Sequence, residues 1–188
     1  MIGTIPNLLT IARVVAAPVI AACYFAFERP LADAVAFAIF FAAAVTDFLD
    51  GWLARKWGQV SGFGRMLDPI ADKAMVTVTG ALLAMLHPFE VWIIAPIALI
   101  LLREVLVSGL REYLKGAEIL SVTTLAKWKT TMQLLSMGTL LLGGATGGAL
   151  IPNLGVALLW IAALMTVITG WDYFAKGLAY IRETEESR

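Results

Sequence analysis

The chain has 188 residues, of which 60% are hydrophobic and 15% charged, and its formal net charge is zero. A soluble domain usually has about a quarter of its residues charged, so this composition favours a protein that lies mostly within a lipid bilayer. The zero net charge gives no support for a nucleic-acid partner. Because no long hydrophilic stretch interrupts the chain, we expect a single membrane domain over residues 1–188.

Hydrophobic runs recur along the chain between short polar breaks, and each is long enough to span a bilayer, which takes about 20 helical residues. They predict six helices, at residues 5–27, 31–54, 66–86, 89–112, 125–143 and 152–178. Thr4 followed by Ile5 and Pro6 is typical of a helix start with proline in the first turn. The glycine-rich segment 143–148 is expected to form a loop.

The basic residues are distributed unevenly between the two sets of predicted loops. One set, together with the C-terminal segment, contains most of the lysines and arginines, for example Arg55 and Arg111. The opposite set contains only Arg29. Because loops rich in lysine and arginine stay in the cytoplasm, we expect both termini and residues 47–72 to lie on the cytoplasmic side.

Four aspartates lie close together around the break between the second and third predicted helices: Asp47, Asp50, Asp68 and Asp72. An α-helix has about 3.6 residues per turn, so Asp47 and Asp50 share one face of the second helix. Asp68 and Asp72, four residues apart, can share a face of the third. Pro69 leaves open whether Asp68 lies inside the third helix or caps it.

These carboxylates are expected to lie below the membrane surface, and an uncompensated acid at the bilayer centre costs about 2.5–3.5 kcal/mol. Two divalent cations would neutralise four carboxylates, and ligation by oxygen alone suits Mg²⁺ or Mn²⁺. The alternative is a network of ion pairs with Arg55, Arg65 and Lys73. The expected fold is therefore an all-α membrane protein of about six transmembrane helices, with a polar, metal-binding cavity at the cytoplasmic side.

The stretch from Asp47 to Arg55 fits the pattern D-x-x-D-G-x-x-A-R, and Gly64, Asp68 and Asp72 continue it as G-x-x-x-D-x-x-x-D. In this pattern the chain resembles the CDP-alcohol phosphotransferase family. The resemblance implies that the four aspartates bind two divalent metal ions, which hold the diphosphate of a CDP-linked donor. It also implies that a further set of residues binds the donor: Asp50, Gly51, Ala54, Arg55 and Gly64.

The same resemblance makes Asp68 and Asp72 the catalytic candidates. Asp72 matches the aspartate proposed in the family as the general base for the acceptor hydroxyl. A metal-bound carboxylate is a weak base, however, so activation of the hydroxyl by the metals themselves stays the alternative.

A second cluster, of basic side chains, follows around the fourth and fifth predicted helices: Arg103, Arg111, Lys127 and Lys129. Arginine can hold a phosphate through two parallel hydrogen bonds. These residues are therefore candidates for binding an anionic acceptor. The alternative is that they only follow the positive-inside distribution or contact anionic lipid headgroups.

Other stretches resemble the bacterial phosphatidylglycerophosphate synthase branch of the family: residues 6–10 with Arg13, 68–73, 103–104, 109–112 and 126–133. This resemblance implies transfer of a phosphatidyl group from CDP-diacylglycerol to sn-glycerol 3-phosphate, giving phosphatidylglycerophosphate and CMP. It also implies a bacterial inner-membrane location and a homodimer.

Two kinds of alternative remain. Within the family, the acceptor could instead be serine, inositol phosphate or phosphatidylglycerol. From a different class, a cation transporter would need ionisable groups through the whole depth of the bilayer, and we do not find that distribution in the sequence.

Overall fold

The computed structural model describes residues 4–56, 61–114 and 124–186. Within these ranges all regular structure is helical, and no strand is present. The six helices are α1 (Ile5–Ala26), α2 (Leu31–Lys56), α3 (Gly62–Leu86), α4 (Val91–Tyr113), α5 (Thr124–Thr146) and α6 (Leu150–Glu186). Each corresponds to one of the predicted hydrophobic runs, so the all-helical fold class is confirmed.

Four of these helices, α1, α3, α4 and α6, are long and apolar enough to cross a membrane, judged by length and composition over the described residues. Side chains from all six helices meet in one core, in which the largest fully buried apolar residues are Ile20, Leu83, Ile97, Ile100, Met137, Leu141 and Leu159. Close van der Waals packing of these side chains holds the helices together as a bundle.

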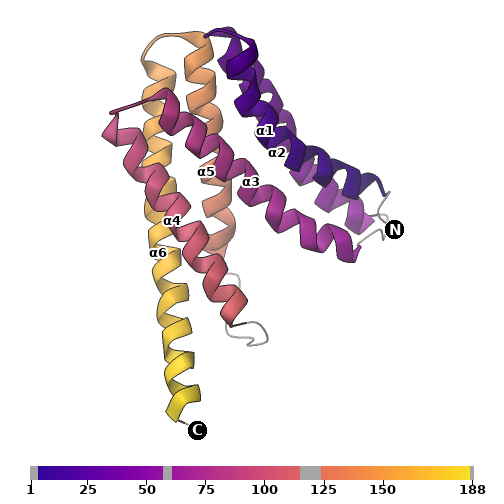
Figure 1. Cartoon of the computed structure of the whole chain (residues 1–188), viewed down its shortest axis with the longest axis vertical. Helices are drawn as coiled ribbons and strands as arrows, with labels where there is room; N and C mark the ends of the chain where they lie inside the picture. Colours follow the sequence, from indigo (N-terminus) through magenta and orange to yellow (C-terminus); the bar gives the residue numbers. More distant parts are fainter. Residues whose placement is uncertain (1–3, 57–60, 115–123, 187–188) are drawn as a thin grey trace.

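The helices alternate in direction along the chain (Figure 1). The α1–α2, α3–α4 and α5–α6 connections all lie at the upper end of the bundle in this view. The ends of α2 and α4 and the beginnings of α3 and α5 therefore point away from those connections. This topology brings the segments with the predicted aspartates and the predicted acceptor residues to the same side of the fold.

Helix α3 begins at Gly62, earlier than the predicted residue 66. Ser61 caps it, because its Oγ accepts a hydrogen bond of 2.9 Å from the backbone N–H of Gly64. Asp68 therefore lies inside the helix together with Pro69, and the interpretation of Asp68 as the cap is wrong.

The expected loop at 143–148 is shorter than predicted, because Gly143 and Gly144 belong to α5. The turn uses Gly147 and Gly148, whose φ angles of 69° and 84° suit glycine. Gly144 instead provides room for neighbouring side chains: a Cβ added there would lie 2.6 Å from the carboxyl carbon of Asp33. A glycine-rich sequence was thus misread as a loop where it marks close helix packing.

Asp33 belongs to a buried polar cluster that the sequence did not predict, at the opposite end of α2 from Asp47. Its carboxylate accepts a hydrogen bond of 2.7 Å from the Tyr24 hydroxyl and one of 2.6 Å from Nε of Arg29. These contacts join the end of α1 to the beginning of α2. Asp33 is thus paired locally rather than part of a chain of ionisable groups.

Replacing Gly144 with alanine is expected to lower the midpoint of thermal unfolding in detergent. The new methyl group would lie 2.6 Å from the Asp33 carboxyl and 2.8 Å from Nη2 of Arg29, and overpacking of a filled interior costs about 1–3 kcal/mol. Gly109→Ala is the matched control, because nothing lies within 4 Å of a Cβ added at Gly109. Equal midpoints for the two variants would contradict the close packing around Asp33.

Candidate active site

A polar cavity of about 520 Å³ lies among α2, α3, α4, α5 and α6. This volume lies within the range of small-molecule sites, about 300–1,000 Å³. One part of its lining is acidic, with Asp47 from α2 and Asp68 and Asp72 from α3. The remaining lining is mainly basic and polar and includes Lys73, Arg103, Arg111 and Lys129. The structure therefore brings the described members of the two clusters predicted from sequence into one cavity.

The acidic side is built on the helical spacing of Asp68 and Asp72, which are one turn apart on α3. Asp47 faces them from the second half of α2. All three side chains are partly exposed, with 38%, 52% and 43% of the side-chain surface accessible for Asp47, Asp68 and Asp72. They are therefore accessible from the cavity to a ligand.

Arg13 of α1 pairs with these three aspartates, although its own side chain is only 2% exposed. Its Nη1 contacts Oδ1 of Asp47 and lies 3.0 Å from Oδ1 of Asp72. Its Nη2 lies 3.9 Å from Oδ1 of Asp68. Arg13 thus provides a positive charge at the centre of the acidic cluster.

Sequence reasoning missed this role of Arg13. It treated the residue as part of a family pattern and expected any ion pairs with the aspartates to involve Arg55, Arg65 or Lys73. The signal was present, because Asn7, Thr10 and Arg13 recur every three residues on an otherwise apolar helix and are all buried. A buried polar stripe of this kind indicates a partner on a neighbouring helix.

The other two members of the stripe do contact α3 and its cap. Thr10 Oγ1 lies 3.0 Å from Oδ1 of Asp68, within hydrogen-bonding distance. Asn7 Oδ1 accepts a hydrogen bond of 2.9 Å from Ser61. A Cβ added at Gly64 would lie 2.8 Å from Asn7 Oδ1, so the structure uses Gly64 for close contact between α1 and α3.

The basic side is organised around Glu104 of α4. Glu104 Oε1 accepts hydrogen bonds from Lys129 Nζ and, at 3.2 Å, from Nη1 of Arg103. Arg103 also approaches Thr169 at 3.4 Å and the Tyr173 ring at 5.7 Å. Because both cations are buried, one carboxylate shared between them offsets much of the cost of burying their charge.

Arg111 and Lys73 complete the basic side at more accessible positions. Arg111 is exposed, donates a hydrogen bond of 3.1 Å from Nη2 to the Tyr173 hydroxyl, and stacks 5.0 Å from the Tyr173 ring centre. Lys73 donates to Ser108 of α4 rather than to an aspartate. Lys73 was not among the predicted acceptor residues, although its position next to Asp72 could have suggested it.

Five of the predicted site residues have side chains outside the described part of the structure: Asp50, Gly51, Ala54, Arg55 and Lys127. Their roles stay predictions. Asp172 and Lys176 form an ion pair of 2.8 Å on α6, and neither residue lines the cavity.

The acidic side offers the kind of oxygen atom that a hard divalent cation prefers, namely the carboxylates of Asp47, Asp68 and Asp72 and, beside Asp68, the hydroxyl of Thr10. Over the described ranges, no three acidic, histidine or cysteine side chains converge closely enough to form a metal centre by themselves. Asp47 and Asp72 converge on Nη1 of Arg13. These oxygen atoms fit a divalent metal ion. Such an ion would compete with the Arg13 guanidinium for the carboxylate oxygens of Asp47 and Asp72.

Known proteins are similar to this chain over most of its length. The family model for CDP-alcohol phosphatidyltransferase matches residues 3–168. The chain is 44% identical to the CDP-diacylglycerol–glycerol-3-phosphate 3-phosphatidyltransferase of Cereibacter sphaeroides, over 96% of this chain and 98% of that protein. Identity to the proteins of the same name is 45% for Rickettsia bellii, over 90% and 93%, and 40% for Haemophilus influenzae, over 92% and 94%.

Proposed function

The chain belongs to the CDP-alcohol phosphatidyltransferase family, and from this membership we propose that it transfers a phosphatidyl group from CDP-diacylglycerol to sn-glycerol 3-phosphate. The products are phosphatidylglycerophosphate and CMP. The relatives named for this reaction support the choice of substrates. The observation that carries the proposal is the cavity itself, which joins an acidic cluster for the donor to a basic cluster for the acceptor.

The donor diphosphate is anionic, so aspartates alone would repel it. We propose that Asp47, Asp50, Asp68 and Asp72 hold two divalent metal ions, Mg²⁺ or Mn²⁺. Such ions, when bound, supply positive charge to the diphosphate and to the leaving CMP. The residues Gly51, Ala54, Arg55 and Gly64 are proposed to hold the rest of the donor headgroup.

The reaction needs an in-line arrangement of acceptor and donor within the cavity. The oxygen of the glycerol hydroxyl forms a bond to the phosphorus that bears diacylglycerol. The bond between that phosphorus and the oxygen bridging to CMP breaks, and CMP leaves with the electron pair. The hydroxyl proton passes to the carboxylate of Asp72, which lines the cavity beside Lys73 and Ser108.

The basic side favours an acceptor with a phosphate group. Four cations line it, and Glu104 is the one acid among the lining residues that the structure describes on α4, α5 and α6. The phosphate of glycerol 3-phosphate is a dianion that would offset most of this excess of positive charge. A zwitterion such as serine would leave the excess uncompensated, so the charge of the lining favours an acceptor with a phosphate group, such as glycerol 3-phosphate.

We also propose how the protein is placed in the cell. The four long apolar helices support an integral membrane protein, and the bacterial relatives support a bacterial membrane. All six helices are proposed to span the inner membrane. The excess of basic residues near the cavity favours a cytoplasmic location for the cavity and both termini.

The substrate assignment is tested by following CMP release from CDP-diacylglycerol by the purified protein in detergent. Glycerol 3-phosphate, serine, inositol phosphate and phosphatidylglycerol would be compared as acceptors, each with Mg²⁺ and with EDTA. Release that needs both Mg²⁺ and glycerol 3-phosphate is expected. Preference for another acceptor would retain the family and overturn the proposed substrate.

Replacing Arg111 with glutamine is expected to raise the KM for glycerol 3-phosphate with a smaller effect on kcat. Loss of one hydrogen bond to a charged group corresponds to about 1.5–3 kcal/mol, or roughly a tenfold to hundredfold change. Lys176→Gln removes a positive charge from α6 outside the cavity and is the control. A KM that changes equally in both variants would show that bulk charge, rather than Arg111, attracts the acceptor.

A further inference from the structure

The aromatic side chain of Tyr173, on α6, lines the polar cavity on its basic side. The residue is almost completely buried, with 2% of its surface exposed. A tyrosine has only two side-chain torsions, so it loses little conformational freedom when it is held in one place. Tyr173 therefore presents a rigid surface to the charged side chains around it, and the proposed transfer reaction gives it no role.

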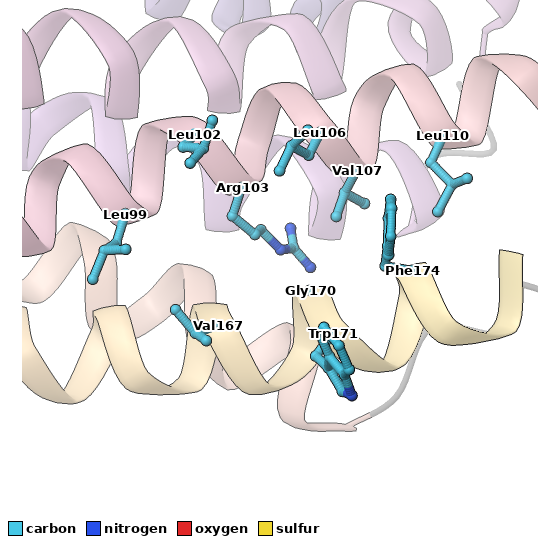
Figure 2. A pocket seen from close by; sticks show the side chains of 10 residues that line it. All are labelled: Leu99, Leu102, Arg103, Leu106, Val107, Leu110, Val167, Gly170, Trp171 and Phe174. Atoms are coloured by element: carbon cyan, nitrogen blue, oxygen red, sulfur yellow. The ribbon is translucent and has the colours of Figure 1, made fainter. Parts of the chain in front are cut away.

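Two glycines of α6 determine how closely Tyr173 approaches α4. Gly170 lies three residues before Tyr173 and Gly177 four residues after it, so all three share one face of the helix. A Cβ at Gly170 would lie 2.8 Å from Cγ of Arg103, and one at Gly177 would lie 2.8 Å from Cδ1 of Leu110. Figure 2 shows Arg103 extending from α4 towards Gly170. The glycines thus allow close packing that holds the face with Tyr173 against α4.

Two arginines of α4 meet at the Tyr173 ring. The guanidinium carbon lies 5.7 Å from the ring centre for Arg103 and 5.0 Å for Arg111. Both distances are within the range of about 6 Å over which an aromatic face attracts a cation. The two arginines are about two helical turns apart on α4, yet their side chains converge on one ring. The ring therefore offsets part of the repulsion between two neighbouring positive charges.

The Tyr173 hydroxyl also orients Arg111, because it accepts a hydrogen bond of 3.1 Å from Nη2 of that residue. Arg111 is exposed, and an exposed arginine that is not held loses rotamer freedom when it binds a ligand. Contact with Tyr173 restricts the side chain before any ligand arrives. An arginine has five N–H donors, so this hydrogen bond uses only one of them. A guanidinium held in advance binds a phosphate more tightly than one that must first be ordered.

From these contacts we propose that Tyr173 is a positioning residue for the phosphate of the acceptor. Its ring and hydroxyl hold Arg103 and Arg111 as a preformed pair, and this pair binds a phosphomonoester dianion. Tyr173 acts through the two arginines and takes no part in the bond that forms or the bond that breaks. The proposal rests on the proposed function only for the identity of the dianion as glycerol 3-phosphate.

Equilibrium binding of radiolabelled glycerol 3-phosphate to the purified protein, in detergent with Mg²⁺, tests this role without requiring turnover. Tyr173→Phe keeps the ring and loses the hydroxyl, so the Kd is expected to rise about threefold to tenfold. Tyr173→Leu also loses the ring, and a rise of about tenfold to hundredfold is expected. Tyr180→Phe is the matched control, because Tyr180 also belongs to α6 and does not line the polar cavity. Inorganic phosphate is expected to compete with the label, and glycerol is not.

A double variant separates positioning from simple packing. Because the hydroxyl acts through Arg111, adding Tyr173→Phe to Arg111→Gln is expected to raise the Kd by less than about twofold further. In turnover, Tyr173→Phe is expected to raise the KM for glycerol 3-phosphate while the KM for CDP-diacylglycerol stays within about twofold. A residue that only packs would lower the unfolding midpoint and leave the Kd unchanged.

Equal Kd values for the wild type and Tyr173→Phe would overturn the proposal. So would the same fold-change on adding Tyr173→Phe to the wild type and to Arg111→Gln, or a wild type that does not bind glycerol 3-phosphate. Binding that weakens as expected, in protein that releases no CMP, would retain the role of Tyr173 and overturn the proposed reaction. The conservative Tyr173→Phe substitution decides the question even where Tyr173→Leu fails to fold.

Discussion

Asp72→Asn is expected to reduce the rate of CMP release by about a hundredfold or more, the usual contribution of a general base. Asparagine keeps the size of the side chain but removes the negative charge and the proton-accepting oxygen. Asp72 lines the cavity and lies 3.0 Å from Nη1 of Arg13. On the proposed mechanism the substitution removes both a metal ligand and the group that accepts the hydroxyl proton.

Asp172→Asn is the matched control for this experiment. Asp172 is an aspartate on α6 that pairs with Lys176 and does not line the cavity. Its replacement is expected to leave kcat within about twofold of the wild-type value, as for surface changes that cost under about 0.5 kcal/mol. Full activity of Asp72→Asn, in protein with wild-type helical content, would exclude Asp72 from the catalytic step.

Arg13→Gln is expected to lower the thermal stability of the protein and to increase its response to Mg²⁺. The substitution leaves Asp47 and Asp72 close together without the guanidinium that both contact. Breaking a buried ion pair costs about 3–5 kcal/mol. Because these aspartates are partly exposed to solvent, we expect a smaller loss, about 1–3 kcal/mol.

Divalent cations would compensate for the lost charge, so Mg²⁺ should raise the unfolding midpoint of Arg13→Gln more than that of the wild type. Arg13→Lys keeps the charge but has one ammonium in place of a forked guanidinium, so an intermediate midpoint is expected. The measurement is thermal unfolding in detergent over a series of Mg²⁺ concentrations. A Mg²⁺ response identical in all three proteins would contradict shared use of the aspartate oxygens by Arg13 and a metal.

The helices could be predicted from sequence because each hydrophobic run in this chain is bounded by polar residues. The spacing of Asp68 and Asp72 likewise fixed their common face, since helical periodicity is a local property. The extent of the helices was less predictable. α6 continues to Glu186, beyond the predicted residue 178. The end was predicted too early because the last turns of the helix are mostly polar and carry no hydrophobic signal.

Contacts between helices were harder to predict, because one sequence contains no direct information about which helices are neighbours. Arg13 and Asp72 are 59 positions apart in the chain. Glu104 and Lys129 were recognised as charged, but their pairing depends on how α4 and α5 pack. Gly144 was interpreted as a loop residue because a sequence does not distinguish a glycine in a turn from a glycine at a close contact between helices.

The most direct test of the proposed reaction follows the acceptor into the product. Purified protein would be incubated with CDP-diacylglycerol, Mg²⁺ and radiolabelled glycerol 3-phosphate, and the label in extracted lipid would be compared with the CMP formed. The expected result is label in phosphatidylglycerophosphate in equimolar amount to CMP, and neither product with Asp72→Asn. CMP formed without labelled lipid would indicate hydrolysis of the donor and would contradict transfer to glycerol 3-phosphate.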